Sequence, residues 1–208
     1  IYARLAEGSD ARLIVLPETA LPRFLDLVDS AYIGRLKAAA VRSGGDLLLG
    51  VPVRNAAGDY LNSVISLGVS PSTSYDKGHL VPFGEFVPPG FGWIVRVLSI
   101  PLADFSRGAA NQRPMAIAGQ RVAVNVCYED AYGAEIIRQL PEATLLVNVS
   151  NVAWFGDSLA PAQHLQIARM RALETGRVYL AAANTGITAA IWPDASVRQR
   201  MPQFTRGR

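Results

Sequence analysis

Three residues of this chain have side chains suited to covalent catalysis: Glu18, Lys77 and the only cysteine, Cys127. The thiol is a candidate nucleophile, and the carboxylate is a candidate base that removes its proton. The ammonium group is a candidate clamp for a developing oxyanion. Each residue follows a predicted strand or lies in a loop, and ligands of α/β sheets bind beyond the carboxyl ends of the strands. We therefore expect one reactive centre at a sheet edge.

Each of these residues also has an ordinary structural interpretation. Free cysteines often pack as small hydrophobic side chains. Glu18 precedes Thr19 and Pro22 and suits a helix start, and a loop lysine is usually exposed. Composition argues against an exposed, idle Lys77: of the 20 lysines and arginines, only Lys37 and Lys77 are lysines. A compact ammonium fits beside an oxyanion where a guanidinium does not, so a lysine at position 77 indicates a chemical role.

The elements that must position these residues alternate along the chain. Continuous apolar runs bounded by turn residues predict buried strands, and helical periodicity with a glycine stop predicts helices. The predicted strands cover 12–17, 46–53, 61–67, 121–127, 144–149, 178–183 and 187–192. The predicted helices cover 1–9, 26–43, 92–99, 132–140 and 160–176, with an irregular stretch at 75–92. This order predicts a layered α/β domain with a mixed sheet.

Composition narrows the class of protein. The chain has 208 residues, half of them hydrophobic, which is enough for one domain, 1–208. Its net charge of +3 comes from scattered arginines, which argues against a nucleic-acid partner. A single cysteine excludes an internal disulfide, and the spacing of His79 and His164 does not suit a metal, so we expect neither metal nor cofactor. No apolar run approaches the length that crosses a bilayer.

Motifs along nearly the whole chain resemble one known superfamily. The Glu–Lys–Cys order is similar to the triad of the nitrilase, or carbon–nitrogen hydrolase, superfamily. Within that superfamily, the phrases resemble the periplasmic domain of the apolipoprotein N-acyltransferases. They are Pro17–Pro22, Tyr75–Pro88, Val126–Glu129, Asn148–Ser158, Gln163–Glu174 and Asn184–Thr188. The sequence departs from the family pattern at Val152 and Gly78, which concerns loop structure rather than the triad.

The resemblance implies a particular architecture and place in the cell. It implies an α-β-β-α sandwich with mixed sheets, here without its first strand and without flanking membrane helices. The chain 1–208 would then be an excerpt of a longer protein of the bacterial inner membrane, with this domain on the periplasmic side. A missing first strand would leave one sheet edge unpaired.

The resemblance also implies a reaction. Glu18 would deprotonate Cys127, whose thiolate would attack the ester of a membrane phospholipid, while Lys77 and the backbone N–H of Tyr128 hold the oxyanion. The acyl-thioester would pass to the amine of a diacylglyceryl-cysteine apolipoprotein in a ping-pong mechanism without a cofactor. The enzyme is expected to be a monomer.

Further residues are assigned roles by the same resemblance. Glu85 would orient Lys77, with a loop salt bridge as the alternative, and Tyr128 and Glu129 match positions that the family needs. Glu129 also suits the start of the following helix. Apart from the resemblance, the aromatic side chains of Trp154 and Phe155 lie in a loop with Gly and Asp, which indicates that they line an acyl entrance or touch the bilayer, like Trp93 and Phe91. The alternative is packing beneath the loop.

Two other functions use the same features. A nitrilase-family amidase would place the triad on small amides or nitriles with water as the acceptor. A non-catalytic lipid- or peptide-binding domain would keep only the fold, which an intact Glu18, Lys77 and Cys127 disfavours.

Overall fold

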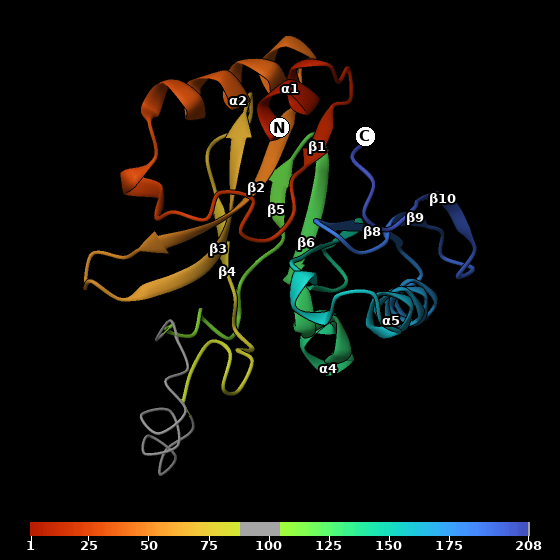
Figure 1. Cartoon of the computed structure of the whole chain (residues 1–208). Helices are drawn as coiled ribbons and strands as arrows, with labels where there is room; N and C mark the ends of the chain where they lie inside the picture. The colour runs from red at the N-terminus through yellow and green to blue at the C-terminus, as the bar shows by residue number, and fades with distance from the viewer. Residues whose placement is uncertain (88–104, 208) are drawn as a thin grey trace.

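Two β-sheets packed face to face form the centre of the molecule, with helices on both outer faces (Figure 1). The computed structural model describes residues 1–87 and 105–207. One sheet has the order β1-β2-β3-β4, and the other has the order β10-β9-β8-β7-β6-β5. Helices α1 and α2 cover the first sheet, and α4 and α5 lie beyond the second. The α-β-β-α sandwich with mixed sheets is thus confirmed.

The first half of the chain builds the four-stranded sheet and its helices. Its elements are α1 (Tyr2–Glu7), β1 (Leu13–Val15), a 3-10 turn (Leu25–Leu27), α2 (Ser30–Arg42), β2 (Asp46–Arg54), β3 (Tyr60–Gly68) and β4 (Ser74–Asp76). Asp29 caps α2 by accepting a hydrogen bond from the Ala31 N–H. β1 runs parallel to β2, and β2, β3 and β4 pair antiparallel. Among the described residues β1 pairs only with β2, so it is an edge strand.

The second half of the chain builds the six-stranded sheet. Its elements are β5 (Met115–Ile117), β6 (Gln120–Val126), η2 (Cys127–Ala131), α4 (Gly133–Ile136), η3 (Ile137–Gln139), β7 (Leu145–Ser150), η4 (Ala153–Phe155), α5 (Ala160–Thr175), β8 (Val178–Ala183), β9 (Thr188–Ile191) and β10 (Val197–Met201). Strands β6, β7 and β8 are parallel neighbours. Their carboxyl ends therefore lie at one edge, where Cys127 follows β6.

Alternation of side chains along the strands produces three apolar layers. On β2, Leu47 and Leu49 pack against α1 and α2, whereas Leu48 packs between the sheets. On β6, Val124 faces the first sheet and Ala123 faces the layer beneath α5. Strands buried on both faces read as continuous apolar runs, which is why the sequence predicted them.

Three short elements differ from the sequence prediction. β4 lies inside the stretch predicted to be irregular, and β10 was not predicted, because three residues and a largely exposed strand carry little hydrophobic signal. The helix predicted at 132–140 is broken into α4 and η3. The helix predicted at 92–99 lies outside the described residues. Within 1–87 and 105–207, no helix combines the length and hydropathy of a membrane span.

Candidate active site

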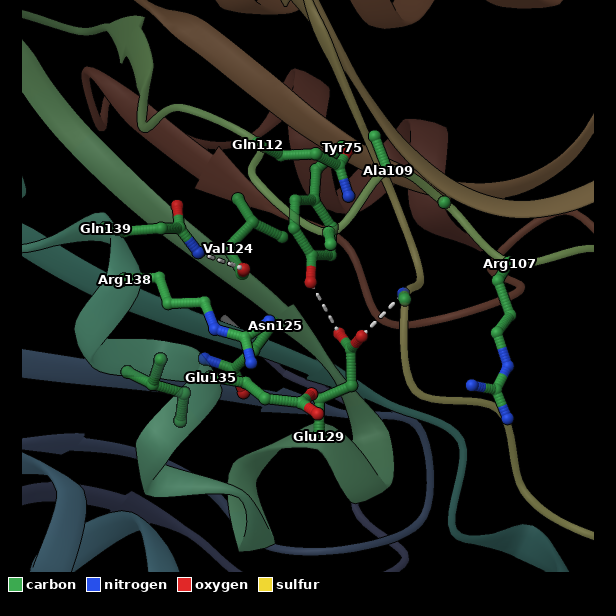
Figure 2. A pocket seen from close by; sticks show the side chains of 14 residues that line it. Tyr75, Arg107, Ala109, Gln112, Val124, Asn125, Glu129, Glu135, Arg138 and Gln139 are labelled. Carbon is green, nitrogen blue, oxygen red and sulfur yellow. Dashed lines mark hydrogen bonds between the residues drawn. The ribbon is translucent and has the colours of Figure 1, made fainter.

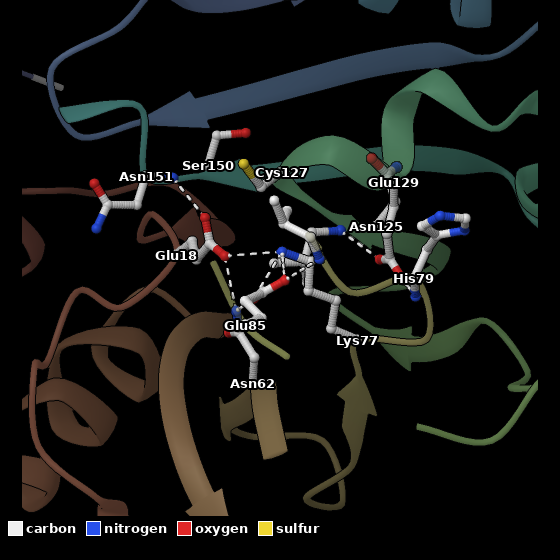
Figure 3. A network of polar contacts seen from close by, with 12 residues as sticks. Glu18, Asn62, Lys77, His79, Glu85, Asn125, Cys127, Glu129, Ser150 and Asn151 are labelled. Atoms are coloured by element: carbon white, nitrogen blue, oxygen red, sulfur yellow. Dashed lines mark hydrogen bonds and ion pairs between the residues drawn. The ribbon is translucent and has the colours of Figure 1, made fainter. Parts of the chain in front are cut away.

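Cys127 is held at a sharp turn directly after β6. Its φ is +50°, a left-handed conformation that is uncommon for a residue with a side chain. Such backbone strain costs about 1–3 kcal/mol and clusters at functional sites. The residue is 9% exposed, and Figure 3 shows its sulfur on the side of the site where Ser150, Asn151 and Glu18 lie. The fold therefore presents the thiol at the carboxyl edge of the parallel strands.

Opposite the thiol lies a charged cluster of four side chains, Glu18, Asn62, Lys77 and Glu85 (Figure 3). Lys77 follows β4 and is 1% exposed. Its Nζ lies 3.3 Å from Glu18 Oε1 and 2.9 Å from Glu85 Oε2. A buried ammonium needs carboxylate partners to offset its lost hydration. The contact to Glu85 is the one expected for a residue that orients Lys77.

Asn62, on β3, joins the two carboxylates of the charged cluster. Its Nδ2 donates to Glu18 Oε1 at 2.8 Å and to Glu85 Oε1 at 2.7 Å. The other Glu18 oxygen accepts from the backbone N–H of Asn151 at 2.7 Å. Sequence reasoning missed Asn62; a buried strand that carries an amide in its interior was the available signal.

The charges around Cys127 determine its resting state. Burial raises the pKa of the Cys127 thiol, and the nearby Glu18 charge raises it further, while Lys77 acts in the opposite direction. Burial would lower the pKa of Lys77, but the charges of Glu18 and Glu85 outweigh it and raise that pKa. The site therefore holds a neutral thiol beside a fixed ammonium, and attack by sulfur needs a base. Glu18, whose charge acts on the thiol, stays the predicted base.

Glu129 connects the lysine loop to the cysteine turn. Its carboxylate accepts from the N–H groups of Gly78 (2.7 Å), His79 (2.9 Å) and Val126 (2.7 Å), and from the Tyr75 hydroxyl at 3.0 Å. Burial raises the pKa of Glu129, although these hydrogen bonds oppose the rise. The residue belongs to η2 and acts as a brace between two loops, rather than as the start of a helix.

A polar cavity of about 210 Å³ lies behind this brace (Figure 2). Tyr75 and Glu129 form part of its wall, with Arg107, Arg138 and Gln139 around them. The Glu129 carboxylate in this wall already accepts four hydrogen bonds.

The predicted aromatic residues lie at the surface. Tyr128 is partly exposed, and its hydroxyl accepts from that of Tyr132 at 2.7 Å. Trp154 is 86% exposed and Phe155 is 50% exposed, so neither ring packs beneath its loop. Trp93 and Phe91 lie outside the described residues.

Fold and site together define a class of protein: an α-β-β-α sandwich with a buried cysteine beside a lysine that contacts two carboxylates. The carbon–nitrogen hydrolase family model matches residues 1–207, and the chain belongs to that family. Among solved structures, a carbon–nitrogen hydrolase from Helicobacter pylori superposes with a TM-score of 0.75 over 97% of this chain and 79% of its own, at 18% identity. An amidase from Nesterenkonia AN1 superposes with a TM-score of 0.68, covering 97% of this chain and 79% of that one at 18% identity. These likenesses show the fold.

Curated relatives are more similar in sequence. The chain is 54% identical over 208 residues to an apolipoprotein N-acyltransferase from Nitrosomonas europaea, covering 99% of this chain and 42% of the relative. It is 39% identical to an apolipoprotein N-acyltransferase from Pseudomonas aeruginosa, covering 95% of this chain and 40% of that protein. The chain thus spans about two fifths of the length of these relatives.

Proposed function

We propose that the chain is the catalytic domain of an N-acyltransferase that modifies lipoproteins. It would move a fatty acyl chain from a membrane phospholipid, through a thioester on Cys127, to the N-terminal amine of a diacylglyceryl-cysteine apolipoprotein. One observation carries the proposal: an assembled Glu18–Lys77–Cys127 site in a chain 54% identical, over nearly its whole length, to an apolipoprotein N-acyltransferase.

The first half-reaction forms the thioester. Sγ of Cys127 attacks the ester carbonyl while its proton passes to Glu18. Negative charge develops on the carbonyl oxygen, where Lys77 and the backbone N–H of Tyr128 stabilise it. When the tetrahedral intermediate collapses, the C–O bond breaks, and the lysophospholipid oxygen takes the proton from Glu18.

The second half-reaction consumes the thioester. The amine of the apolipoprotein attacks the same carbonyl carbon and gives a proton to Glu18. The C–S bond breaks, an amide remains on the acceptor, and the Cys127 sulfur takes that proton from Glu18. Lys77 stays charged throughout, because Glu85 contacts its Nζ even while Glu18 carries the proton.

The substrates imply a location for the domain. A phospholipid donor and a lipidated acceptor are both held in a membrane, so residues 1–208 would work at the periplasmic side of the bacterial inner membrane, as one domain of a longer membrane protein. The exposed rings of Trp154 and Phe155 would contact acyl chains at the entrance, since apolar side chains on loops suit such contacts.

An amidase reaction is the main competing function. The same fold occurs in an amidase, but at 18% identity, whereas the N-acyltransferase relatives reach 54%. Water and an amine are both possible acceptors for a thioester on Cys127. The acceptor is therefore the property to measure.

Mass spectrometry of the full-length protein with phospholipid tests the proposal. We expect an acyl adduct on Cys127 that is absent from Cys127→Ala and disappears when a diacylglyceryl-cysteine peptide is added, with acylated peptide as the product. Fatty acid released without the peptide, at the same rate as with it, would establish a hydrolase. Absence of any adduct would support the binding-domain alternative.

A further inference from the structure

Four neutral polar side chains are buried directly behind Cys127, and we call them the amide network. They are Asn125 on β6, Asn148 and Ser150 on β7, and Tyr179 on β8. Tyr179 packs in the apolar layer between the six-stranded sheet and α5, and Asn148 and Ser150 line a small pocket there together with Asp130 and His164. Burying such groups costs free energy unless they are hydrogen-bonded. Their position therefore needs a reason.

The hydrogen bonds between members of the amide network determine which way the Asn148 amide faces. Asn125 Oδ1 accepts from the Tyr179 hydroxyl at 3.1 Å and from Asn148 Nδ2 at 2.6 Å. Asn148 Oδ1 accepts from the Ser150 hydroxyl. A rotated Asn148 amide would face its oxygen toward that of Asn125, so the orientation of Asn148 is determined by its neighbours.

The amide network ends on the nucleophile. The Asn148 Nδ2 group also donates to the backbone carbonyl of Cys127 at 3.1 Å. That carbonyl belongs to the peptide unit between Cys127 and Tyr128. In a trans peptide the C=O and the N–H point in opposite directions within one plane. The hydrogen bond from Asn148 that holds the Cys127 carbonyl oxygen therefore also fixes the direction of the Tyr128 N–H, which points away from Asn148.

We propose that Asn148 is a positioning residue for the oxyanion site. It anchors the Cys127 carbonyl, keeps the strained left-handed turn at Cys127 in place, and aims the Tyr128 N–H at the oxygen that gains charge. The bond to the carbonyl also polarises the same peptide unit, which strengthens its N–H as a donor. The inference rests on the proposed function for two points: Cys127 as the acylated residue and the Tyr128 N–H as an oxyanion donor.

Two reactions of Cys127 separate positioning from general stability. Acylation passes through a tetrahedral oxyanion, whereas alkylation by iodoacetamide is a direct displacement of iodide by sulfur and forms none. We expect Asn148→Leu to slow acylation by about 10-fold or more, below the 10²–10³ that follows loss of a whole oxyanion donor. Alkylation should keep its wild-type rate. Asn148→Thr, whose hydroxyl can donate, should recover part of the acylation rate.

Tyr179→Phe is the matched control, because it removes a bond within the amide network and leaves the Asn148–Cys127 contact intact. Both variants are compared in the full-length protein, with thermal unfolding as the measure of stability. Equal losses of acylation and alkylation in Asn148→Leu would overturn the proposal, and so would an unchanged acylation rate. Losses that follow the unfolding temperature alone, with Tyr179→Phe impaired as much as Asn148→Leu, would also overturn it.

The acyl donor separates this inference from the proposed function. Acylation is measured with phospholipid and with p-nitrophenyl acetate, a small activated ester that also forms an oxyanion. Failure of wild-type protein with phospholipid alone would count against the proposed function, and the ester would still test Asn148. Failure of wild-type Cys127 with both donors would contradict both.

Discussion

Two buried polar groups flank Cys127, and they differ in charge. The charged cluster holds two carboxylates and one ammonium, Glu18, Glu85 and Lys77, around the amide of Asn62. The amide network behind the nucleophile is neutral. Removing one member of a buried ion pair leaves an uncompensated charge, whereas removing a neutral member leaves one unsatisfied donor or acceptor. We therefore expect substitutions in the charged cluster to affect proton transfer and charge, and substitution of Asn148 to affect the direction of the Cys127–Tyr128 peptide unit.

The two groups also differ in how the chain assembles them. Asn125 and Asn148 are directly paired residues of the parallel strands β6 and β7, so formation of that sheet brings them together. The charged cluster needs the first sheet, with Glu18 after β1 and Lys77 after β4, to dock against the second, which carries Cys127. Docking of the two sheets thus brings the charged cluster to Cys127. Register within the six-stranded sheet brings together Asn125 and Asn148 of the amide network.

The largest expected effect is at Lys77. Lys77→Met removes an oxyanion donor, which typically costs 10²–10³ in rate. It also leaves the buried Glu18 and the partly buried Glu85 without their cation, and breaking a buried pair costs about 3–5 kcal/mol. Acyl-adduct formation on Cys127 and chemical denaturation measure the two losses. Lys37→Met, at an exposed position on α2, is the matched control. Retention of more than a tenth of the acylation rate in Lys77→Met would contradict the assigned role.

Glu85→Gln should have the next largest effect. The amide keeps the shape of the side chain but loses its charge, so Lys77 keeps only Glu18 as an ionic partner and shifts toward it. Displacement of a catalytic group by about 1 Å can cost 10²-fold. We expect kcat to fall with little change in KM. Glu142→Gln, at an exposed residue 3.7 Å from Arg121, should leave both unchanged; a change confined to KM in Glu85→Gln would instead indicate a substrate-binding role.

The pH dependence of stability tests another charged group near Cys127, the pair Asp130 and His164. Asp130, on η2, has its Oδ2 atom 3.0 Å from His164 Nδ1. Burial would lower the pKa of His164, but the hydrogen bond and charge of Asp130 outweigh it and raise it above its usual value of about 6.5. A raised folded pKa stabilises the protein below the unfolded pKa, and this stability is lost as pH rises through the folded value.

We therefore expect the wild-type free energy of unfolding to lose this contribution as pH rises above about 6.5. Denaturant unfolding at a series of pH values should show the loss in wild type and in His79→Gln, but not in His164→Gln. An identical pH dependence in wild type and His164→Gln would refute the coupling. The result bears on the site because the Asp130 charge also raises the pKa of Cys127.

The charged cluster was largely predictable from sequence, and the amide network was not. Glu18, Lys77, Glu85 and Cys127 follow strands or lie in an apolar loop, and their residue types indicate chemistry directly. Asn148 is an alternate residue in a strand, a pattern that also fits a solvent-facing position. Asn148 gains its partners from two features of the fold. The strand register places it beside Asn125, and the left-handed turn at Cys127 brings the Cys127 carbonyl to it. Neither property is visible in local sequence.

The smallest expected effect on stability is at Trp154. Because its ring is 86% exposed, Trp154→Ala should change the free energy of unfolding by no more than about 0.5 kcal/mol. If the ring contacts the acyl chain or the bilayer, acylation by phospholipid should slow through a higher KM, while acylation by p-nitrophenyl acetate stays at the wild-type rate. Trp192→Ala, at another exposed tryptophan beyond β9, should affect neither donor. If acylation by both donors slowed equally in Trp154→Ala, the ring would instead belong to the groups that shape the charged cluster. Trp154 would then not be a residue of the acyl entrance alone.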